Sequence, residues 1–309
     1  MDKNQVVNSE DYMMKEMTIT EIFDRAKKQL DGGDLSAGYI VNGHTFHNYY
    51  TNQEWQEYVD RMPREVKTQF DDGKGGEMQE YPRNGIVYPP KMASYASSSR
   101  FMYSQGQQFD GFAYEKQLST GLGGYPANLD GYLKSKNVFV EAKCHEFYNY
   151  SRPELRKGHR MLLEGIIPML DGKLDYDRSK DTLYLFWENK DSGYFDFKQM
   201  LCHLCGIANM VLGGDEKTVN FIYLAYRPSK ELLIFVDDPS DRQQILDLFN
   251  DEMEMAKTID FKLIYKAILH YFNQRKKYGY SEDEISKMAS SFSFTFCTQD
   301  NFKSVVESL

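Results

Sequence analysis

The chain has 309 residues, of which 41% are hydrophobic and 27% charged, and this ordinary globular composition excludes wholesale disorder. Its formal net charge of −9, from 37 Lys and Arg against 46 Asp and Glu, argues at first against a nucleic-acid partner, because phosphate contacts need basic side chains. No apolar run reaches the ~20 residues that cross a bilayer, and the four cysteines make no disulfide framework. The N-terminus also lacks a signal-peptide layout. We therefore expect a cytoplasmic protein with no membrane partner.

The first ninety residues predict a helical extension. Thr18 and Glu21 form a capping-box pair that opens one helix, and a second helix is expected over Gln53–Phe70. We therefore divide the chain into a helical N-terminal extension, residues 1–90, and a second domain, residues 91–309.

The second domain mixes helices and strands. Two strands are expected over Ala127–Leu133 and Val138–Lys143, joined by a short turn. Further helices are expected over Lys91–Gln105, Phe112–Ser119, Ser151–Leu170, Phe195–Leu212, Asp241–Ala256 and Phe261–Asn273, after the Ser281–Glu284 cap and at the end of the chain. Further strands are expected over Thr182–Glu188, Val219–Tyr226, Leu232–Val236 and Phe292–Thr298. This order favours an α/β fold with a mixed sheet.

The two consecutive strands carry the polar residues that point to chemistry. Side chains alternate along a strand, so Glu141 and Lys143 share a face with Phe139. If the strands pair through their short turn, Asp130 comes close to Glu141, and two carboxylates and a lysine converge at a sheet edge. The alternative is a surface Asp with an exposed Glu–Lys pair on an edge strand.

Two neighbouring carboxylates repel each other unless a cation lies between them. Oxygen ligands of this kind suit Mg²⁺ or Mn²⁺, which bind through one or two carboxylates together with water and substrate phosphate. The metal would activate a bound water while Lys143 orients that water or steadies the phosphoryl oxygens. The combination therefore suits hydrolysis of a phosphodiester.

Asp130, ten intervening residues and then Glu141-Ala142-Lys143 resemble the D-x(n)-(D/E)-x-K signature of the PD-(D/E)XK restriction-endonuclease-like superfamily. The wider string YEKQLSTGLGGYPANLDGYL…VFVEAKCHEF is similar to a bacterial branch of restriction endonucleases. The resemblance covers residues 91–226 well and the C-terminal third loosely, and Leu129 stands where the signature has its proline. It implies a restriction-endonuclease-like mixed sheet flanked by helices over residues 91–309.

The resemblance also assigns roles to residues of this chain. It implies that Asp130 and Glu141 bind Mg²⁺, for which Mn²⁺ substitutes, and that Glu115 is a further carboxylate ligand. Lys143 would act on the nucleophilic water, and Gln199 would orient the site or touch the substrate. On the residues alone, His203 lies one helical turn after Gln199 and shares its face.

Basic residues give candidate contacts to nucleic acid. The segment RPELRKGHR carries a local charge of +3 and could hold a DNA backbone, although a solvated helix face explains it equally well. The candidate contacts are Arg100, Arg152, Arg156, Lys157 and His203.

Two other motifs have simpler interpretations. We interpret Gly121, Gly123 and Gly124 as a turn rather than a phosphate-binding loop, because they lead into a strand. We interpret Cys202 and Cys205 as core residues rather than zinc ligands, because their helix is apolar.

The main hypothesis is a Mg²⁺-dependent DNA endonuclease of the restriction or phage-defence kind, with DNA as its substrate. A homodimer and a companion methyltransferase or defence-system protein are the further partners that the resemblance allows. The alternatives are a catalytically silent nuclease-fold protein that binds nucleic acid or a protein, and a metal-dependent enzyme acting on small phosphate compounds. Because Asp237–Asp260 alone contributes −6 to the net charge, the acidic total does not exclude a basic DNA-binding face elsewhere.

Overall fold

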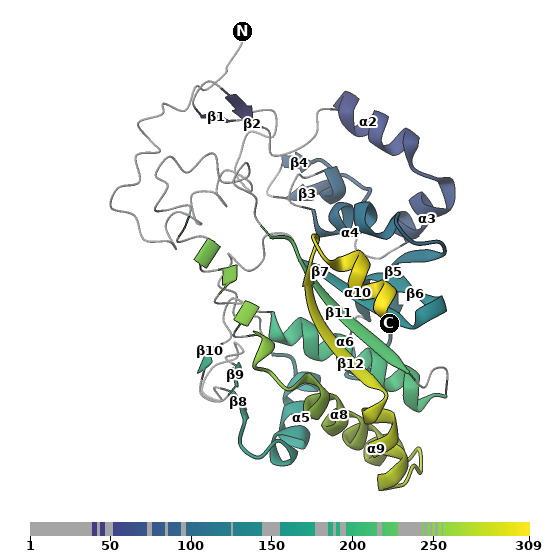
Figure 1. Cartoon of the computed structure of the whole chain (residues 1–309), viewed down its shortest axis with the longest axis vertical. Coiled ribbons are helices and arrows are strands. Elements are labelled where there is room, and N and C mark those ends of the chain that lie inside the picture. Colours follow the sequence, from purple (N-terminus) through teal and green to yellow (C-terminus); the bar gives the residue numbers. More distant parts are fainter. Residues whose placement is uncertain are drawn as a thin grey trace.

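A five-stranded mixed sheet lies at the centre of the computed structural model (Figure 1). Its strands, in the spatial order β12-β11-β7-β6-β5, are β5 (Phe112–Leu118), β6 (Ala127–Leu133), β7 (Val138–Lys143), β11 (Val219–Ala225) and β12 (Phe292–Thr298). β5, β6 and β7 run antiparallel to one another, whereas β11 is parallel to both β7 and β12. The prediction of an α/β fold with a mixed sheet flanked by helices is confirmed, and β7 is the middle strand.

The structure describes residues 39–41, 44–46, 52–72, 76–83, 86–93, 97–124, 126–143, 155–176, 185–187, 190–191, 196–214, 218–227, 243, 246–247, 249–250, 253–254 and 256–309. The helix expected after Thr18, the strand expected over Leu232–Val236 and much of the helix expected over Asp241–Ala256 lie outside these residues.

Helices cover both faces of the sheet, because successive residues of β7 point to opposite sides and both sides carry apolar residues. Val138, Val140 and Ala142 pack in one hydrophobic cluster with α4 (Ser98–Gly106) and α10 (Phe302–Ser308). Phe139 packs in a second cluster with α5 (Lys157–Ile166), α6 (Phe197–Leu212), α8 (Phe261–Lys276) and α9 (Glu282–Ser290). Glu141 and Lys143 therefore belong to the face that α6 covers, as their alternation predicts.

α6 lies close to the sheet because Gly206 has no side chain. A Cβ at this position would be 2.7 Å from the Cβ of Leu118 on β5, nearer than two such atoms approach in practice. The N-terminal half of the same helix is thereby held over β7. None of the helices in the described part of the chain is long and apolar enough to cross a membrane.

The expected helix over Gln53–Phe70 is two helices, α2 (Asn52–Arg61) and α3 (Arg64–Asp72). Pro63 separates them, because proline lacks an N–H and disfavours a helical conformation in the residue before it. Phe70 of α3 packs against the rings of Tyr103 and Tyr114, so α3 joins the core of the main sheet.

The described part of residues 1–90 is not entirely helical. It also holds two hairpins, β1 (Tyr39–Val41) with β2 (His44–Phe46) and β3 (Tyr81–Arg83) with β4 (Ile86–Tyr88). The expected helical extension therefore contains strands as well as helices, and the division at residue 90 stays a prediction.

The helix expected over Phe112–Ser119 is wrong, because Phe112–Leu118 forms strand β5. Its residues are compatible with a helix locally, but pairing with β6 decides the conformation, since tertiary context overrides propensity. The glycine-rich turn thus joins two strands of a hairpin. Gly121, Gly123 and Gly124 all have positive φ, which supports their interpretation as a turn.

The remaining elements follow the expectations more closely. α5 begins at Lys157, later than the expected start at Ser151, and its N-cap is Arg156. The capping box of Ser281 and Glu284 is present at the start of α9. The other short elements are the 3-10 helices η2 (Lys91–Ala93), η3 (Lys134–Lys136) and η5 (Ile167–Met169) and a small sheet of β8 (Leu174–Tyr176), β9 (Leu185–Trp187) and β10 (Lys190–Asp191).

Candidate functional site

Three carboxylates lie in one row across β5, β6 and β7. β5 and β6 pair on both sides of Glu115 and Asp130, which places these two residues opposite each other. The ladder between β6 and β7 ends at Gly131 and Val140, so Asp130 and Glu141 are the next residues in register. Sequence reasoning paired Asp130 with Glu141 correctly and placed Glu115 nearby, but on a helix instead of a neighbouring strand.

The strands are distorted where this row crosses them. Leu129 and Tyr132 are three residues apart yet pack in the same cluster, whereas Tyr114 and Leu118 are four apart and pack in opposite ones. In a regular strand, residues three apart lie on opposite faces and residues four apart lie on the same face. Glu115 has a φ of 54°, a conformation that costs a non-glycine residue about 1–2 kcal/mol. Such strained residues cluster at functional sites, which makes this row the candidate site.

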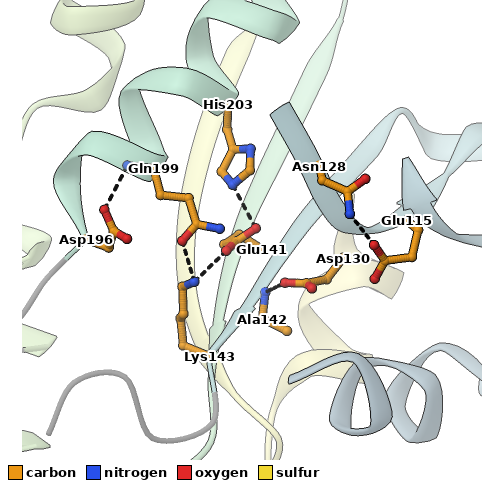
Figure 2. A network of polar contacts seen from close by, with 9 residues as sticks. All are labelled: Glu115, Asn128, Asp130, Glu141, Ala142, Lys143, Asp196, Gln199 and His203. Carbon is orange, nitrogen blue, oxygen red and sulfur yellow. Dashed lines mark hydrogen bonds and ion pairs between the residues drawn. The ribbon is translucent and has the colours of Figure 1, made fainter. Parts of the chain in front are cut away.

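Asp130 closes the gap that opens between β6 and β7. Its Oδ2 accepts a hydrogen bond of 2.8 Å from the backbone N–H of Ala142, in place of a ladder carbonyl (Figure 2). Burial raises the pKa of Asp130 well above its usual value, and the charges of Glu141 and Glu115 raise it further. The Asp130 carboxylate therefore favours a proton or a cation as its neighbour.

Glu115 is 7% exposed and points to the α4 side of the sheet. It accepts hydrogen bonds from Ser99 Oγ, at 3.3 Å, and from the Asn128 amide. Burial, followed by the charge of Glu77, raises the pKa of Glu115 to about 7, although both hydrogen bonds act in the opposite direction. Glu115 is thus a second carboxylate that would gain from a nearby cation.

The raised pKa of Glu115 predicts a pH dependence of stability. A carboxylate with a pKa of about 7 in the folded state and 4.5 in the unfolded state keeps its proton longer when folded. Stability is therefore lost as pH rises from about 4.5 to 7, by up to about 3 kcal/mol from this one group. In urea titrations at pH 5 and pH 8 without divalent metal, Glu115→Gln should lose less stability between the two pH values than the wild type does. An equal loss in both proteins would contradict the assignment.

Glu141 is fully buried on the middle strand and has two close polar neighbours (Figure 2). Its Oε1 lies 2.7 Å from Lys143 Nζ, and its Oε2 lies 2.8 Å from His203 Nε2. Burial alone would raise the pKa of Glu141, but Lys143 and His203 outweigh it and lower the pKa to about 2. The neighbouring side chains thus stabilise the negative charge of Glu141 without a metal.

α6 supplies the residues that hold Lys143 and Glu141 in place. Gln199 Oε1 accepts a hydrogen bond of 2.6 Å from Lys143 Nζ, and Gln199 lies one turn before His203. The side chain of Asp196 caps the helix by accepting from the Gln199 backbone N–H at 2.9 Å. An Asp before an apolar helix is a recognisable cap, so Asp196 could have been found from the sequence, whereas Ser99 and Asn128 became partners of Glu115 only through packing.

The structure corrects two expectations about this location. The converging residues do not lie at a sheet edge, because β7 is the central strand. The alternative of an exposed Glu–Lys pair is also wrong, since Glu141 is 0% and Lys143 6% exposed. Moving both charges of an ion pair out of water onto a central strand costs free energy. Glu141 and Lys143 are therefore not an ordinary surface salt bridge.

The candidate nucleic-acid contacts lie apart from one another. Arg100 is half-buried on α4, whereas Arg156 and Lys157 are exposed at the start of α5. Arg152 lies outside the described residues. His203 is 1% exposed and faces Glu141, so in this structure it belongs to the carboxylate network instead of a surface that DNA could touch.

Comparison with known proteins adds no relative. No protein-family model, no curated protein and no solved structure matches the chain. The chemistry of the site is therefore argued from its own residues.

The carboxylate row could hold a divalent cation of the Mg²⁺ type only together with other ligands. Among the described residues no three His, Cys, Asp or Glu side chains gather closely enough to hold a metal on their own. Mg²⁺, however, retains several waters and needs only one or two carboxylates together with a substrate phosphate. Burial is the largest cause of the raised pKa values of Asp130 and Glu115, and neighbouring carboxylates raise both further, so a nearby cation would favour their ionised forms.

Zinc at the cysteines has less support. Cys205 is fully buried in α6, and the Cys202 Sγ lies 3.4 Å from His159 Nε2. Burial raises the pKa of Cys202 to about 11, which opposes the thiolate form that binds metal. This agrees with the interpretation of both cysteines as packing residues.

Proposed function

We propose that the chain is a metal-dependent endonuclease of the PD-(D/E)XK restriction-endonuclease-like kind, which hydrolyses phosphodiester bonds in DNA. The observation that carries the proposal is the row of Glu115, Asp130 and Glu141 across three neighbouring strands, with Lys143 beside Glu141. The D…ExK spacing of the sequence and the five-stranded mixed sheet support it. A cytoplasmic restriction or phage-defence role, with its companion proteins, is part of the same proposal.

In this proposal Asp130 and Glu141 hold Mg²⁺ or Mn²⁺, with Glu115 next in the row. The ion supplies positive charge that lowers the pKa of a water and offsets the charge developing on the phosphate. Lys143, held by Gln199, orients the attacking water and steadies the phosphoryl oxygens. Water attacks phosphorus in line and the ester oxygen leaves, so no covalent intermediate with the protein forms. Arg156 and Lys157 are exposed and can contact the DNA backbone.

One observation favours the alternative of a catalytically silent protein of the same fold. Both oxygens of Glu141 already have partners, Lys143 on one side and His203 on the other. If this network stayed closed when nucleic acid bound, Glu141 would stabilise the core instead of holding a metal. The chain would then bind nucleic acid or a protein partner without cleaving it.

Plasmid cleavage separates the two candidates. We expect the wild type to nick or linearise supercoiled DNA with Mg²⁺ or Mn²⁺ and to be inactive in EDTA. Lys143→Met should lose about 10²-fold or more in rate, because it removes the group that stabilises the developing charge. The matched control Glu164→Gln changes an exposed carboxylate on α5 and should cleave normally. Metal-dependent cleavage unaffected by Lys143→Met would refute the site, and DNA binding without cleavage would favour the silent protein.

A further inference from the structure

A cavity of about 720 Å³ lies beside α6. Its walls come from edge strand β5, the end of β6, the C-terminal half of α6 and the end of α8. None of Glu115, Asp130, Glu141, Lys143, Gln199 or His203 lines it. Gly206, Asn209 and Met210 do, and they follow His203 by about 5–10 Å along the helix.

The charge of this cavity is positive. Lys116, Lys134 and Lys276 line it, and no Asp or Glu is among its lining residues. None of the ion pairs within the described part of the chain involves any of these three lysines. Three ammonium groups around one space repel one another, so an anion there would be favoured.

Two of the lysines are held in position by uncharged groups. Lys276 Nζ donates a hydrogen bond of 2.8 Å to Asn209 Oδ1 and lies 5.3 Å from the centre of the Phe272 ring. Lys116 Nζ lies 5.3 Å from the centre of the Tyr132 ring. Aromatic rings and amide oxygens orient an ammonium group without neutralising it, so both charges remain available to a ligand.

The glycine-rich turn contributes to this arrangement. Gly121 has a φ of +67°, and a Cβ there would be 2.7 Å from Asn209 Nδ2 and 3.0 Å from Lys276 Nζ. A side chain at this position would therefore clash with Asn209 and Lys276, whose hydrogen bond holds Lys276 beside the cavity. Asn209 in turn donates to the Ser119 carbonyl at 3.1 Å, so the turn and α6 hold each other.

The size and the rim of the cavity indicate more than a lone phosphate. Its volume falls in the range of about 300–1,000 Å³ that small organic ligands occupy. Tyr278 is 37% exposed and lines the cavity, so its ring can stack on a planar group. Tyr132 is less able to do so, because it stacks on Phe139 and Lys116 lies against its ring.

We propose that this cavity binds a nucleotide, with its phosphates on Lys116, Lys134 and Lys276 and its base on Tyr278. The proposal does not rest on the nuclease hypothesis, since it uses none of the carboxylate row. The nucleotide could be free in solution or part of a DNA strand, and the two sources share the chemistry that the cavity recognises.

Calorimetric titration of the full chain tests this, with ATP and a five-nucleotide single-stranded DNA as separate probes. EDTA in the buffer removes binding through a divalent metal. We expect binding of at least one probe, weakened about tenfold by Lys116→Gln and by Lys276→Gln, because each removes a charged contact to phosphate. Lys276→Arg keeps the charge and should retain binding.

A matched control and a second readout keep the outcomes distinct. Lys303→Gln changes an exposed lysine on α10, on the other face of the sheet, and should bind like the wild type. Tyr278→Ala should weaken ATP but leave inorganic triphosphate unchanged, because only the base contact is lost. Binding of the oligonucleotide alone assigns the cavity to a DNA strand, and binding of ATP assigns it to a free nucleotide. Absence of binding by both probes, or equal binding by variants whose circular dichroism melts match the wild type, would overturn the proposal.

Discussion

Glu141→Gln should lower the free energy of unfolding by about 3–5 kcal/mol, because it removes one charge of a buried ion pair. Lys143 is 6% exposed, and its ammonium group lies 2.7 Å from Glu141 Oε1. A neutral amide would remove the ion pair, while Gln199 Oε1 would still accept a hydrogen bond of 2.6 Å from Lys143 Nζ. In the proposed nuclease the same substitution should also remove metal-dependent cleavage.

A double-mutant cycle in urea measures this pair. Lys143→Met alone leaves the Glu141 charge buried beside His203, and Glu141→Gln with Lys143→Met removes both charges. We expect the double variant to be more stable than either single variant, because replacing a buried pair with uncharged groups of similar size costs less than breaking it. Additive losses would show that Glu141 and Lys143 do not depend on each other.

The lowered pKa of Glu141 fixes the pH dependence of this stabilisation. A carboxylate with a pKa of about 2 when folded and 4.5 when unfolded stabilises the protein fully above the unfolded value. The contribution is lost as pH falls from about 4.5 to 2. Wild type and Glu141→Gln should therefore converge in stability toward pH 2, which acid titrations of the urea midpoint can measure.

β6 and β7 were predictable from the sequence with their observed bounds, but β5 was not. The two predicted strands are joined by a short turn, and Val138–Lys143 alternates so regularly that its face assignment is also correct. In β5 the alternation breaks at Glu115, whose positive φ shifts the remaining residues to the other face. A strand interrupted in this way loses its period-two pattern, so its sequence favours a helix.

The sequence predicts those parts of the candidate site that a short strand connection or one turn of a helix brings together. Asp130 and Glu141 come together through the short connection, and Gln199 and His203 through helical spacing. The partner of His203 was not predictable, because it depends on how closely α6 approaches the sheet, which Gly206 sets. His203, a candidate contact to nucleic acid on its sequence, therefore lies in the core.

Asp130→Asn should have the opposite effect on stability from Glu141→Gln. Burial and the neighbouring carboxylates raise the pKa of Asp130, so its ionised form is unfavourable in the folded protein. Stability is then lost as pH rises above the usual carboxylate pKa, and an uncharged side chain avoids that loss. Asparagine can still accept the hydrogen bond from the Ala142 N–H. In EDTA at neutral pH we expect a gain of about 1 kcal/mol in the free energy of unfolding.

The same substitution should remove function, since a residue that destabilises the fold is retained where it holds a ligand. In the proposed nuclease, loss of this one metal-binding carboxylate should reduce cleavage by ~10³-fold, which corresponds to several kcal/mol of transition-state stabilisation. Mg²⁺ at a hundredfold excess over its Kd should stabilise the wild type by about 2.7 kcal/mol and Asp130→Asn by much less. Thermal melts with and without Mg²⁺ measure this difference, with Glu164→Gln as the control. If Mg²⁺ stabilised both proteins equally, the metal would bind elsewhere; if it stabilised neither, Asp130 would have to be explained by the silent, nucleic-acid-binding alternative.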